Sequence, residues 1–412
     1  MDMNQTPAAS RYAIGLFGRR NAGKSSLINA LAGQPIAVTS DVPGTTTDPV
    51  KKAMELLPIG PVVLIDTAGL DDEGELGAKR AEKTYEELRR CNLALVVADA
   101  SSGVTSFEEE FLANLKKRRI PALLVLNKSD QAMPDAAALS ALGARLGVTV
   151  VAVSALTGQG IVGLKEQLVR ASSYEDAEPS LVGDLIGAGD FVVLVTPIDK
   201  AAPKGRLILP QQQTIRDILE KDAVAIVTKE HELKLTLERL GAPPELVITD
   251  SQAFLKVSAD TPPEIPMTSF SILFARQKSD LSEMVRGVKR IEHLVPGDKV
   301  LIVEGCTHHR QSDDIGTVKI PRWIRQIAGG GIEFEWASGA CFPKDVSGYH
   351  LVVHCGGCML NRREMSFRAE EAASQGVSVT NYGVLIAYVL GILPRALAPF
   401  PAALLALNES QT

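Results

Sequence analysis

The sequence predicts an α/β protein of three consecutive domains, because short apolar segments alternate with amphipathic helical segments along most of its length. A chain of 412 residues is also too long for one ordinary hydrophobic core. Two segments interrupt the alternation: the polar, acidic Ser172–Ser180 and the proline-rich Thr261–Pro266. We therefore expect domains at residues 1–171, 172–265 and 266–412.

The first domain is expected to hold a mostly parallel sheet covered by helices on both faces. Its apolar segments predict strands at Tyr12–Phe17, Val62–Ile65, Leu93–Ala98, Ala122–Leu126 and Thr149–Val153, and its amphipathic segments predict helices at Lys24–Ala32 and Leu76–Arg90. The second domain reads as a small α/β unit with strands Phe191–Thr196, Ala223–Val227 and Leu246–Thr249 and helices Thr214–Lys221 and Glu230–Leu240. In the last domain, the apolar segment Val384–Leu393 predicts a buried helix that ends near Pro394.

Composition excludes several classes of protein. The apolar fraction of 45% and the charged fraction of 22% are typical of soluble globular proteins. A net charge of −6 argues against a nucleic-acid partner, since phosphate binding usually requires a basic excess. Five cysteines, an odd number, argue for a reducing compartment and against a disulfide framework. Because Met1–Arg11 lacks an apolar signal and no apolar run is long enough to span a bilayer, we expect a cytoplasmic protein without a membrane partner.

A phosphate-binding loop follows the first predicted strand and opens the first predicted helix. The motif is Gly18-Arg19-Arg20-Asn21-Ala22-Gly23-Lys24-Ser25. Its glycines let backbone N–H groups surround phosphates, and the helix N-terminus adds a favourable dipole. Lys24 is expected to neutralise the β- and γ-phosphates, and the Ser25 hydroxyl to bind Mg²⁺.

Three further motifs predict that the nucleotide is GTP. Asp66-Thr67-Ala68-Gly69 follows a strand, where a carboxylate can face Mg²⁺. Asn127-Lys128-Ser129-Asp130 follows another strand, and the Asp130 carboxylate can accept the N1–H and 2-amino groups of guanine, a pair that adenine lacks. Ser154 and Ala155 follow the last strand and match the loop that closes over guanine. Four such motifs in order predict a GTP-hydrolysing enzyme.

This half of the chain resembles the TrmE–Era–Der branch of GTPases, on the strength of Pro43-Gly44-Thr45-Thr46-Thr47-Asp48 and of Asn21. The resemblance implies that Thr46 binds Mg²⁺ and that Asn21 ligates a K⁺ ion. Leu70 stands where Ras-like enzymes carry a water-orienting glutamine, so we expect slow intrinsic hydrolysis. The expected catalytic residues are Lys24, Thr46 and Asp66. The expected nucleotide-binding residues are Gly18, Asn21, Ala22, Gly23, Lys24, Ser25, Ser26, Thr46, Asp66, Gly69, Asn127, Lys128, Asp130, Ser154 and Ala155.

The last domain carries a cysteine and histidine set typical of metal sites: Cys306, His308, His354, Cys355 and Cys358. Three thiolates and a histidine suit a tetrahedral zinc site. Three thiolates equally suit three corners of a [4Fe-4S] cluster whose fourth iron has a weaker ligand. Spacing alone leaves both open. The other two cysteines, Cys91 and Cys341, are interpreted as small buried apolar residues.

The middle and last domains resemble the HydF family of [FeFe]-hydrogenase maturases. The resemblance covers about residues 11 to 400 and is carried by Pro197–Lys200, Ala202–Gln211, Glu304–His309, Asp313–Gly316, Lys319–Arg322, His354–Met365 and Asn381–Gly383. It implies a GTPase domain, a dimerisation domain and a cluster-binding domain, in that order. Cys306, Cys355 and Cys358 would hold a [4Fe-4S] cluster, with His308 or His354 as fourth ligand, and Arg362 and Arg363 are cationic candidates beside it.

The same resemblance implies a scaffold, a homodimer or homotetramer, that carries a diiron precursor. Two radical-SAM maturases would help to build this precursor, and apo-[FeFe]-hydrogenase would receive it. An alternative is a ribosome-assembly or tRNA-modification GTPase with a structural zinc, which predicts a basic RNA-binding module that the sequence does not display. A third reading, an electron-transfer module, needs a flavin or dinucleotide motif, and none is evident.

Overall fold

The computed structural model of the chain divides into two compact units, residues 1–177 and 178–412. Thr46, Gly69, Leu70, Cys306, His308 and Cys341 lie outside the residues that it describes, as does most of the predicted helix Leu76–Arg90. The described residues are 11–33, 50–67, 84, 86–172, 179–197, 207–305, 314–339 and 342–409. None of the helices in these ranges is both long and apolar enough to cross a bilayer.

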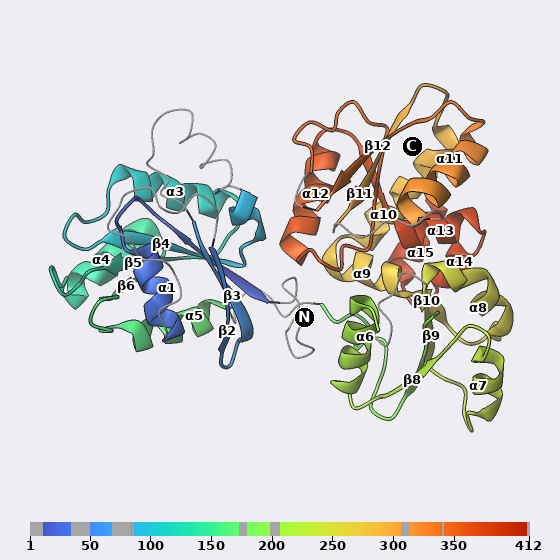
Figure 1. Cartoon of the computed structure of the whole chain (residues 1–412), viewed down its shortest axis with the longest axis horizontal. Helices are drawn as coiled ribbons and strands as arrows, with labels where there is room; N and C mark the ends of the chain where they lie inside the picture. Colours follow the sequence, from blue (N-terminus) through green and yellow to red (C-terminus); the bar gives the residue numbers. More distant parts are fainter. Residues whose placement is uncertain are drawn as a thin grey trace. The chain divides into compact units, whose positions relative to one another are not determined.

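The first unit is a six-stranded sheet in the order β2-β3-β1-β4-β5-β6. Every neighbouring pair is parallel except β2 with β3. Helices α1 (Lys24–Ala32) and α5 (Ile161–Ser172) cover one face, and α3 (Ser106–Lys117) and α4 (Ala136–Leu146) the other (Figure 1). The strands are β1 (Tyr12–Phe17), β2 (Val50–Leu56), β3 (Gly60–Asp66), β4 (Leu93–Asp99), β5 (Ala122–Asn127) and β6 (Thr149–Ala152).

The second unit contains two four-stranded sheets, both parallel throughout. The first sheet has the order β10-β9-β7-β8, with strands β7 (Phe191–Val195), β8 (Val224–Thr228), β9 (Leu246–Thr249) and β10 (Met267–Ser269) and helices α6 (Leu209–Leu219), α7 (Leu233–Arg239) and α8 (Phe254–Asp260). Since β10 pairs with β9, the proline-rich segment Thr261–Pro266 precedes the last strand of this sheet.

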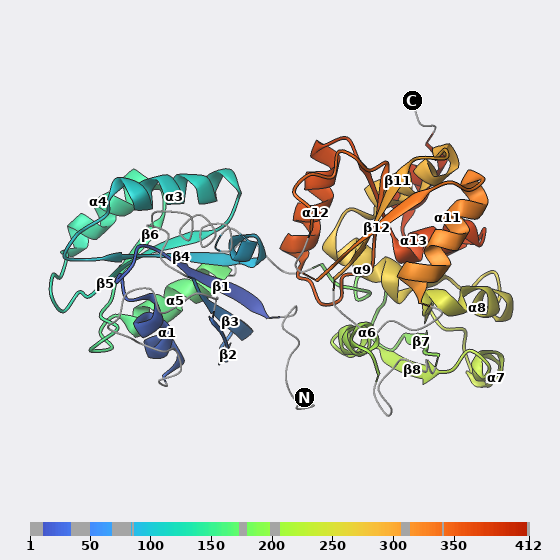
Figure 2. The ribbon, with the colours of Figure 1, turned by 45° about the horizontal axis from the view of Figure 1, so that its top comes forward.

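The second sheet of this unit has the order β12-β11-β13-β14. Helix α12 (Arg362–Ser374) covers one face, and α11 (Ile320–Ala328) and α13 (Tyr382–Val389) cover the other (Figure 2). Its strands are β11 (Lys299–Glu304), β12 (Glu333–Ser338), β13 (Leu351–His354) and β14 (Ser378–Asn381). This part also contains the α-helices α9 (Phe270–Lys278), α10 (Leu281–Val288), α14 (Leu393–Ala396) and α15 (Pro401–Asn408).

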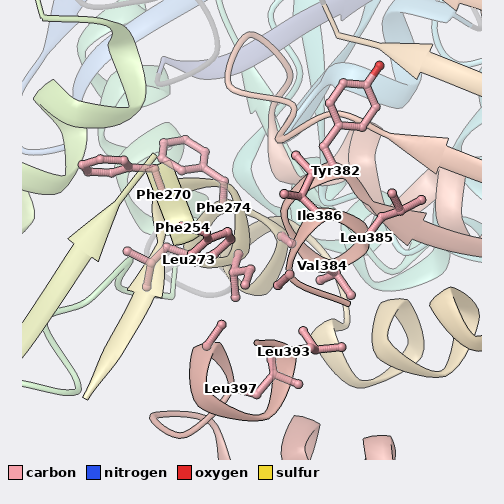
Figure 3. Packing of buried hydrophobic residues seen from close by; sticks show 14 of the residues in the cluster. Phe254, Phe270, Leu273, Phe274, Tyr382, Val384, Leu385, Ile386, Leu393 and Leu397 are labelled. Atoms are coloured by element: carbon pink, nitrogen blue, oxygen red, sulfur yellow. The ribbon is translucent and has the colours of Figure 1, made fainter. Parts of the chain in front are cut away.

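One hydrophobic core serves both sheets of the second unit, because a single cluster of buried side chains runs from Leu181 to Ala406. Helix α9 lies at its centre. Phe270 and Phe274 of α9 pack in the same cluster as Phe254 of α8 and Val384 of α13 (Figure 3). The middle and last parts of the chain therefore share their interior.

The predicted α/β class is confirmed, and the departures from the predicted elements have local causes. The edge strand β2 was not predicted, because the charged residues Lys51, Lys52 and Glu55 interrupt its apolar residues. Helix α6 begins at Leu209, with Pro210 in its first turn, a position where proline is well tolerated. The predicted helix end near Pro394 was wrong: α13 ends at Val389, and Pro394 instead lies in the first turn of α14.

Candidate active site and candidate metal centre

The phosphate-binding loop joins β1 to α1, as the motif requires. Gly18 has φ of +147°, and a Cβ atom there would lie 2.2 Å from the Val97 carbonyl oxygen, so no larger residue fits. Asn21 adopts a left-handed conformation with φ of 58°. Ser26 lies in the first turn of α1, directly after Ser25.

Lys24, Ser25 and Asp66 converge at the start of α1. The buried Lys24 donates its Nζ to the carbonyl oxygens of Gly18 and Arg19, each at 2.9 Å. Ser25 Oγ donates to Asp66 Oδ2 at 2.5 Å. Burial raises the pKa of Asp66, against the lowering effects of the Ser25 hydrogen bond and the Lys24 charge. Two hard oxygen donors side by side, next to a phosphate loop, fit the donor set that Mg²⁺ prefers.

The residues expected to recognise guanine also meet in space. Asn127 donates its Nδ2 to the Ala22 carbonyl at 2.9 Å, and its Oδ1 accepts from the Ala155 N–H at 3.0 Å. It thus connects the phosphate loop to the loop after β6. Ser154 Oγ donates to Asp130 Oδ1 at 2.5 Å, which fixes the orientation of the exposed carboxylate. Lys128 Nζ pairs with Asp99 Oδ2 at 2.7 Å.

One carboxylate of this site, Glu108, was not predicted from the sequence. It is fully buried at the start of α3, where Oε1 accepts from Arg19 Nε at 2.8 Å and Oε2 accepts from the N–H and hydroxyl of Thr105. Thr105 and Glu108 form a capping box, whose pattern is visible in the sequence. Its link to the phosphate loop spans 89 residues and could not be predicted from local spacing.

The candidate metal centre lies at the carboxyl end of the second four-stranded sheet. Cys355 directly follows β13, and its N–H donates to the Val303 carbonyl of neighbouring β11 at 2.9 Å. The Cys355 sulfur accepts backbone N–H groups from Gly305 at 3.1 Å and from Gly357 at 3.3 Å. Because Gly305 immediately precedes Cys306, the chain that leads into Cys306 contacts the Cys355 sulfur.

The thiols present fit a soft metal or an iron–sulfur cluster. Cys355 and Cys358 are half-buried in the loop that leads to α12, and N–H groups facing a sulfur stabilise its thiolate form. Within the described ranges, no three His, Cys, Asp or Glu side chains gather as a metal site, but Cys306 and His308 fall outside those ranges. Cys91 is completely buried, as expected for a small apolar residue.

His354 engages both ring nitrogens with its surroundings. Its Nε2 faces Arg368 NH1 at 3.1 Å and its Nδ1 faces the Cys355 carbonyl at 2.9 Å. Burial, reinforced by the Arg368 charge, lowers the pKa of His354 to about 3, so the ring is neutral. It therefore accepts from Arg368 at Nε2 and donates from Nδ1. Binding of iron by His354 would require one of these hydrogen bonds to break.

Among the described residues of this region, the buried cations are Lys278 and Arg368, and neither was predicted from the sequence. Arg368 is 2% exposed, forms an ion pair with Glu364 at 2.8 Å and donates to the Gly339 carbonyl. By contrast, the candidate cation Arg362 is exposed at the start of α12. An i, i+4 acid–base pair such as Glu364 and Arg368 usually marks a solvated helix face, so the burial of this pair could not be predicted from its spacing.

The sheet topology and the nucleotide motifs together define the chain as a GTPase. A 50S ribosome-binding GTPase family model matches residues 13–128. The Hydrogen maturase F dimerization domain matches residues 181–279, and the Hydrogen maturase F tetramerization domain matches residues 282–399. The chain belongs to the hydrogen maturase F family, and it therefore carries domains of a type that forms oligomers.

The GTPase part is also similar to other GTPases. The tRNA modification GTPase MnmE of Paraburkholderia xenovorans is 37% identical over 170 residues, which are 41% of this chain and 36% of that protein. GTPase Der of Rhizobium johnstonii is 30% identical over 247 residues, 58% of this chain and 50% of that protein. The chain thus spans half or less of the length of these curated relatives. Era of Aquifex aeolicus, solved with GDP and AlF4-, gives a TM-score of 0.36 at 18% identity, over 60% of this chain and 97% of that one.

Proposed function

We propose that this GTPase binds a [4Fe-4S] cluster through Cys306, Cys355 and Cys358 and acts as a scaffold that carries a diiron precursor to apo-[FeFe]-hydrogenase. The observation that carries the proposal is the hydrogen bond from the Gly305 N–H to the Cys355 sulfur, because it brings the chain entering Cys306 to the Cys355–Cys358 loop. His308 and His354 remain the proposed fourth ligands. The hydrogen bonds of His354 make His308 the stronger of the two.

In this proposal the nucleotide site works apart from the thiolates. Lys24, Ser25, Thr46 and Asp66 position Mg²⁺ and the phosphates, and Asp130 selects guanine. When bound, the cluster would supply an iron whose fourth ligand is exchangeable, in a site that receives the precursor. GTP hydrolysis would control association with two radical-SAM maturases and the hydrogenase. We propose that the chain works as a homodimer or homotetramer, supported by its two oligomerisation-type domains.

The experiment that tests this proposal is metal analysis of the full-length protein after anaerobic reconstitution with iron and sulfide. We expect about four irons per chain and the absorption spectrum of a [4Fe-4S] cluster. One tightly bound zinc per chain, with no assembly of iron, would overturn the proposal in favour of a ribosome-assembly or tRNA-modification GTPase with a structural zinc.

The glycine between the two cysteines should be essential for the shape of their loop. Gly357 has φ of +61°, and a Cβ atom there would lie 2.6 Å from Met365 Sδ. Gly357→Ala should therefore destabilise the loop by roughly 1–3 kcal/mol and lower the iron content after reconstitution. The matched control is Gly376→Ala, since Gly376 has φ of +75° and open space around its Cβ position. Equal iron contents in the two variants would contradict the expected role of Gly357.

K⁺ should accelerate GTP hydrolysis, and Na⁺ should not. Asn21 is exposed in the phosphate loop, where it would supply a ligand to K⁺. Because position 70 is a leucine and not a water-orienting glutamine, we expect hydrolysis to depend on such a catalytic cation. The measurement is the hydrolysis rate in KCl and in NaCl at equal ionic strength. Asn21→Ala should remove the difference between the two salts. Identical rates for the unsubstituted protein in both salts would rule out the potassium role.

A further inference from the structure

Lys278, the last residue of α9, is a buried lysine directed at the loop between the cysteines and α12. Its side chain is 6% exposed, and a buried ammonium group is costly unless hydrogen bonds satisfy it. Its Nζ donates to the carbonyl oxygens of Leu360 at 2.6 Å and Gly357 at 2.8 Å, and the Cys358 carbonyl lies at 3.5 Å. The charge of Lys278 is therefore satisfied by the backbone of the cysteine loop.

These hydrogen bonds orient two peptide groups around the Cys358 sulfur. In a trans peptide the C=O and the N–H point in opposite directions. The carbonyls of Gly357 and Cys358 face Lys278, and the N–H groups of the same peptides belong to Cys358 and Met359. Burial raises the pKa of the Cys358 thiol, while the Lys278 charge and hydrogen bonds from these two N–H groups lower it. Lys278 thus binds the carbonyl groups of these two peptides, and their N–H groups face the Cys358 sulfur.

The position of Lys278 in the chain is informative as well. It belongs to the segment matched by the dimerization model, residues 181–279, whereas the cysteine loop belongs to the tetramerization model, residues 282–399. The Lys278 ammonium lies 5.0 Å from the Phe274 ring centroid, and its carbonyl accepts from Ser366 of α12 at 3.3 Å. On the same helix, Arg276 pairs with Asp184 at the start of the middle part. The contacts of α9 with the middle part of the chain and with α12 therefore hold Lys278 in position.

We propose that Lys278 is a positioning residue of the cluster site, which holds the Cys355–Leu360 loop in its ligating shape and places a buried positive charge beside the thiolates. This inference rests on the proposed cluster. Reduction adds a negative charge to a cluster, and a buried cation nearby stabilises that charge more strongly than an exposed one. Lys278 accordingly raises the reduction potential of the cluster and slows its loss.

The test compares full-length Lys278→Met and Lys278→Arg with the unsubstituted protein, all reconstituted without oxygen. Lys256→Met is the matched control, because Lys256 pairs with Asp260 on α8 and its side chain is 45% exposed. Three quantities are measured: the midpoint potential from a dithionite titration followed by electron paramagnetic resonance, the rate of iron release to a chelator, and the GTPase rate.

Lys278→Met should have a more negative midpoint potential and release iron roughly 10- to 100-fold faster, as expected for the loss of a hydrogen bond from a charged donor. Lys278→Arg, which keeps the charge, should restore the potential. Lys256→Met should match the unsubstituted protein, and the GTPase rate should be unchanged throughout. If Lys278→Met holds no cluster, that loss supports the positioning role, and the potential of Lys278→Arg then decides the role of the charge.

Two outcomes would overturn the inference: a potential and an iron-release rate in Lys278→Met equal to those of Lys256→Met, or a Lys278→Arg potential far from that of the unsubstituted protein. Failure of the proposed function has a different signature, because the unsubstituted protein would then assemble no iron at all. The two failures are therefore distinguished by the first sample measured.

Discussion

Asp130→Asn is expected to change the preferred substrate from GTP to xanthosine triphosphate, with a change on the order of 10⁴ in the ratio of the two kcat/KM values. In the proposed site the Asp130 carboxylate would accept two N–H groups from guanine, and an asparagine amide can replace only one of the two acceptors. Xanthine carries a carbonyl at the 2-position, which the asparagine NH₂ can bind. Ser154 Oγ, 2.5 Å from Asp130 Oδ1, should hold the new side chain in the same plane.

The measurement is steady-state hydrolysis of both nucleotides by both proteins. Asp135→Asn is the matched control, since Asp135 caps α4 in the same domain through its bond to the Ala138 N–H, and asparagine caps helices equally well. The control should retain the GTP preference. If Asp130→Asn keeps the original ratio of kcat/KM values for the two nucleotides, Asp130 does not determine the preference for guanine.

Cys358→Ala is expected to abolish cluster assembly and leave GTP hydrolysis unchanged. The substitution removes one of three proposed thiolates, and a cube held at two corners is poorly retained. Iron content and absorption after anaerobic reconstitution measure the loss, and the GTPase rate reports the integrity of the first unit. Cys355→Ala and Cys306→Ala should behave in the same way.

Cys91→Ala provides the control for the loss of a cysteine as such. Cys91 is fully buried in the first unit, where its sulfur contacts the Glu87 carbonyl at 3.2 Å, so its replacement should lower stability without changing the iron content. A full complement of iron in Cys358→Ala would remove Cys358 from the proposed ligands.

How far the sequence predicts the structure depends on whether a feature is local. The strands β1 and β4 are continuous apolar runs between turn signals, and their predicted bounds agree with the structure within a residue. The edge strand β2 carries charged side chains and has no such run, so it was not predicted. The nucleotide motifs lie in loops directly after strands, where their spacing is sufficient to place them.

The candidate metal centre was less predictable, because several of its contacts join residues that are far apart in the sequence. The C-x-x-C spacing indicates two thiols close together, and the structure has both in the loop between β13 and α12. Its buried cations lie on other segments of the chain. Lys278 lies 79 residues before Gly357, and Arg368, which donates to His354, lies on the next helix. Whether a lysine is buried depends on which elements pack around it, and no local pattern carries that information.

The common interior of the middle and last sheets has a consequence for how this part of the chain can be divided. A cut at residue 280 would follow the limits of the two family models, yet it would separate Phe270 and Phe274 from Val384 and Leu385, which lie in one core. Neither fragment would keep a complete interior. The two halves should therefore unfold in one transition. A ligand that binds either half should then add its binding free energy to the stability of both. Assembly of subunits and retention of the proposed cluster would then be linked equilibria.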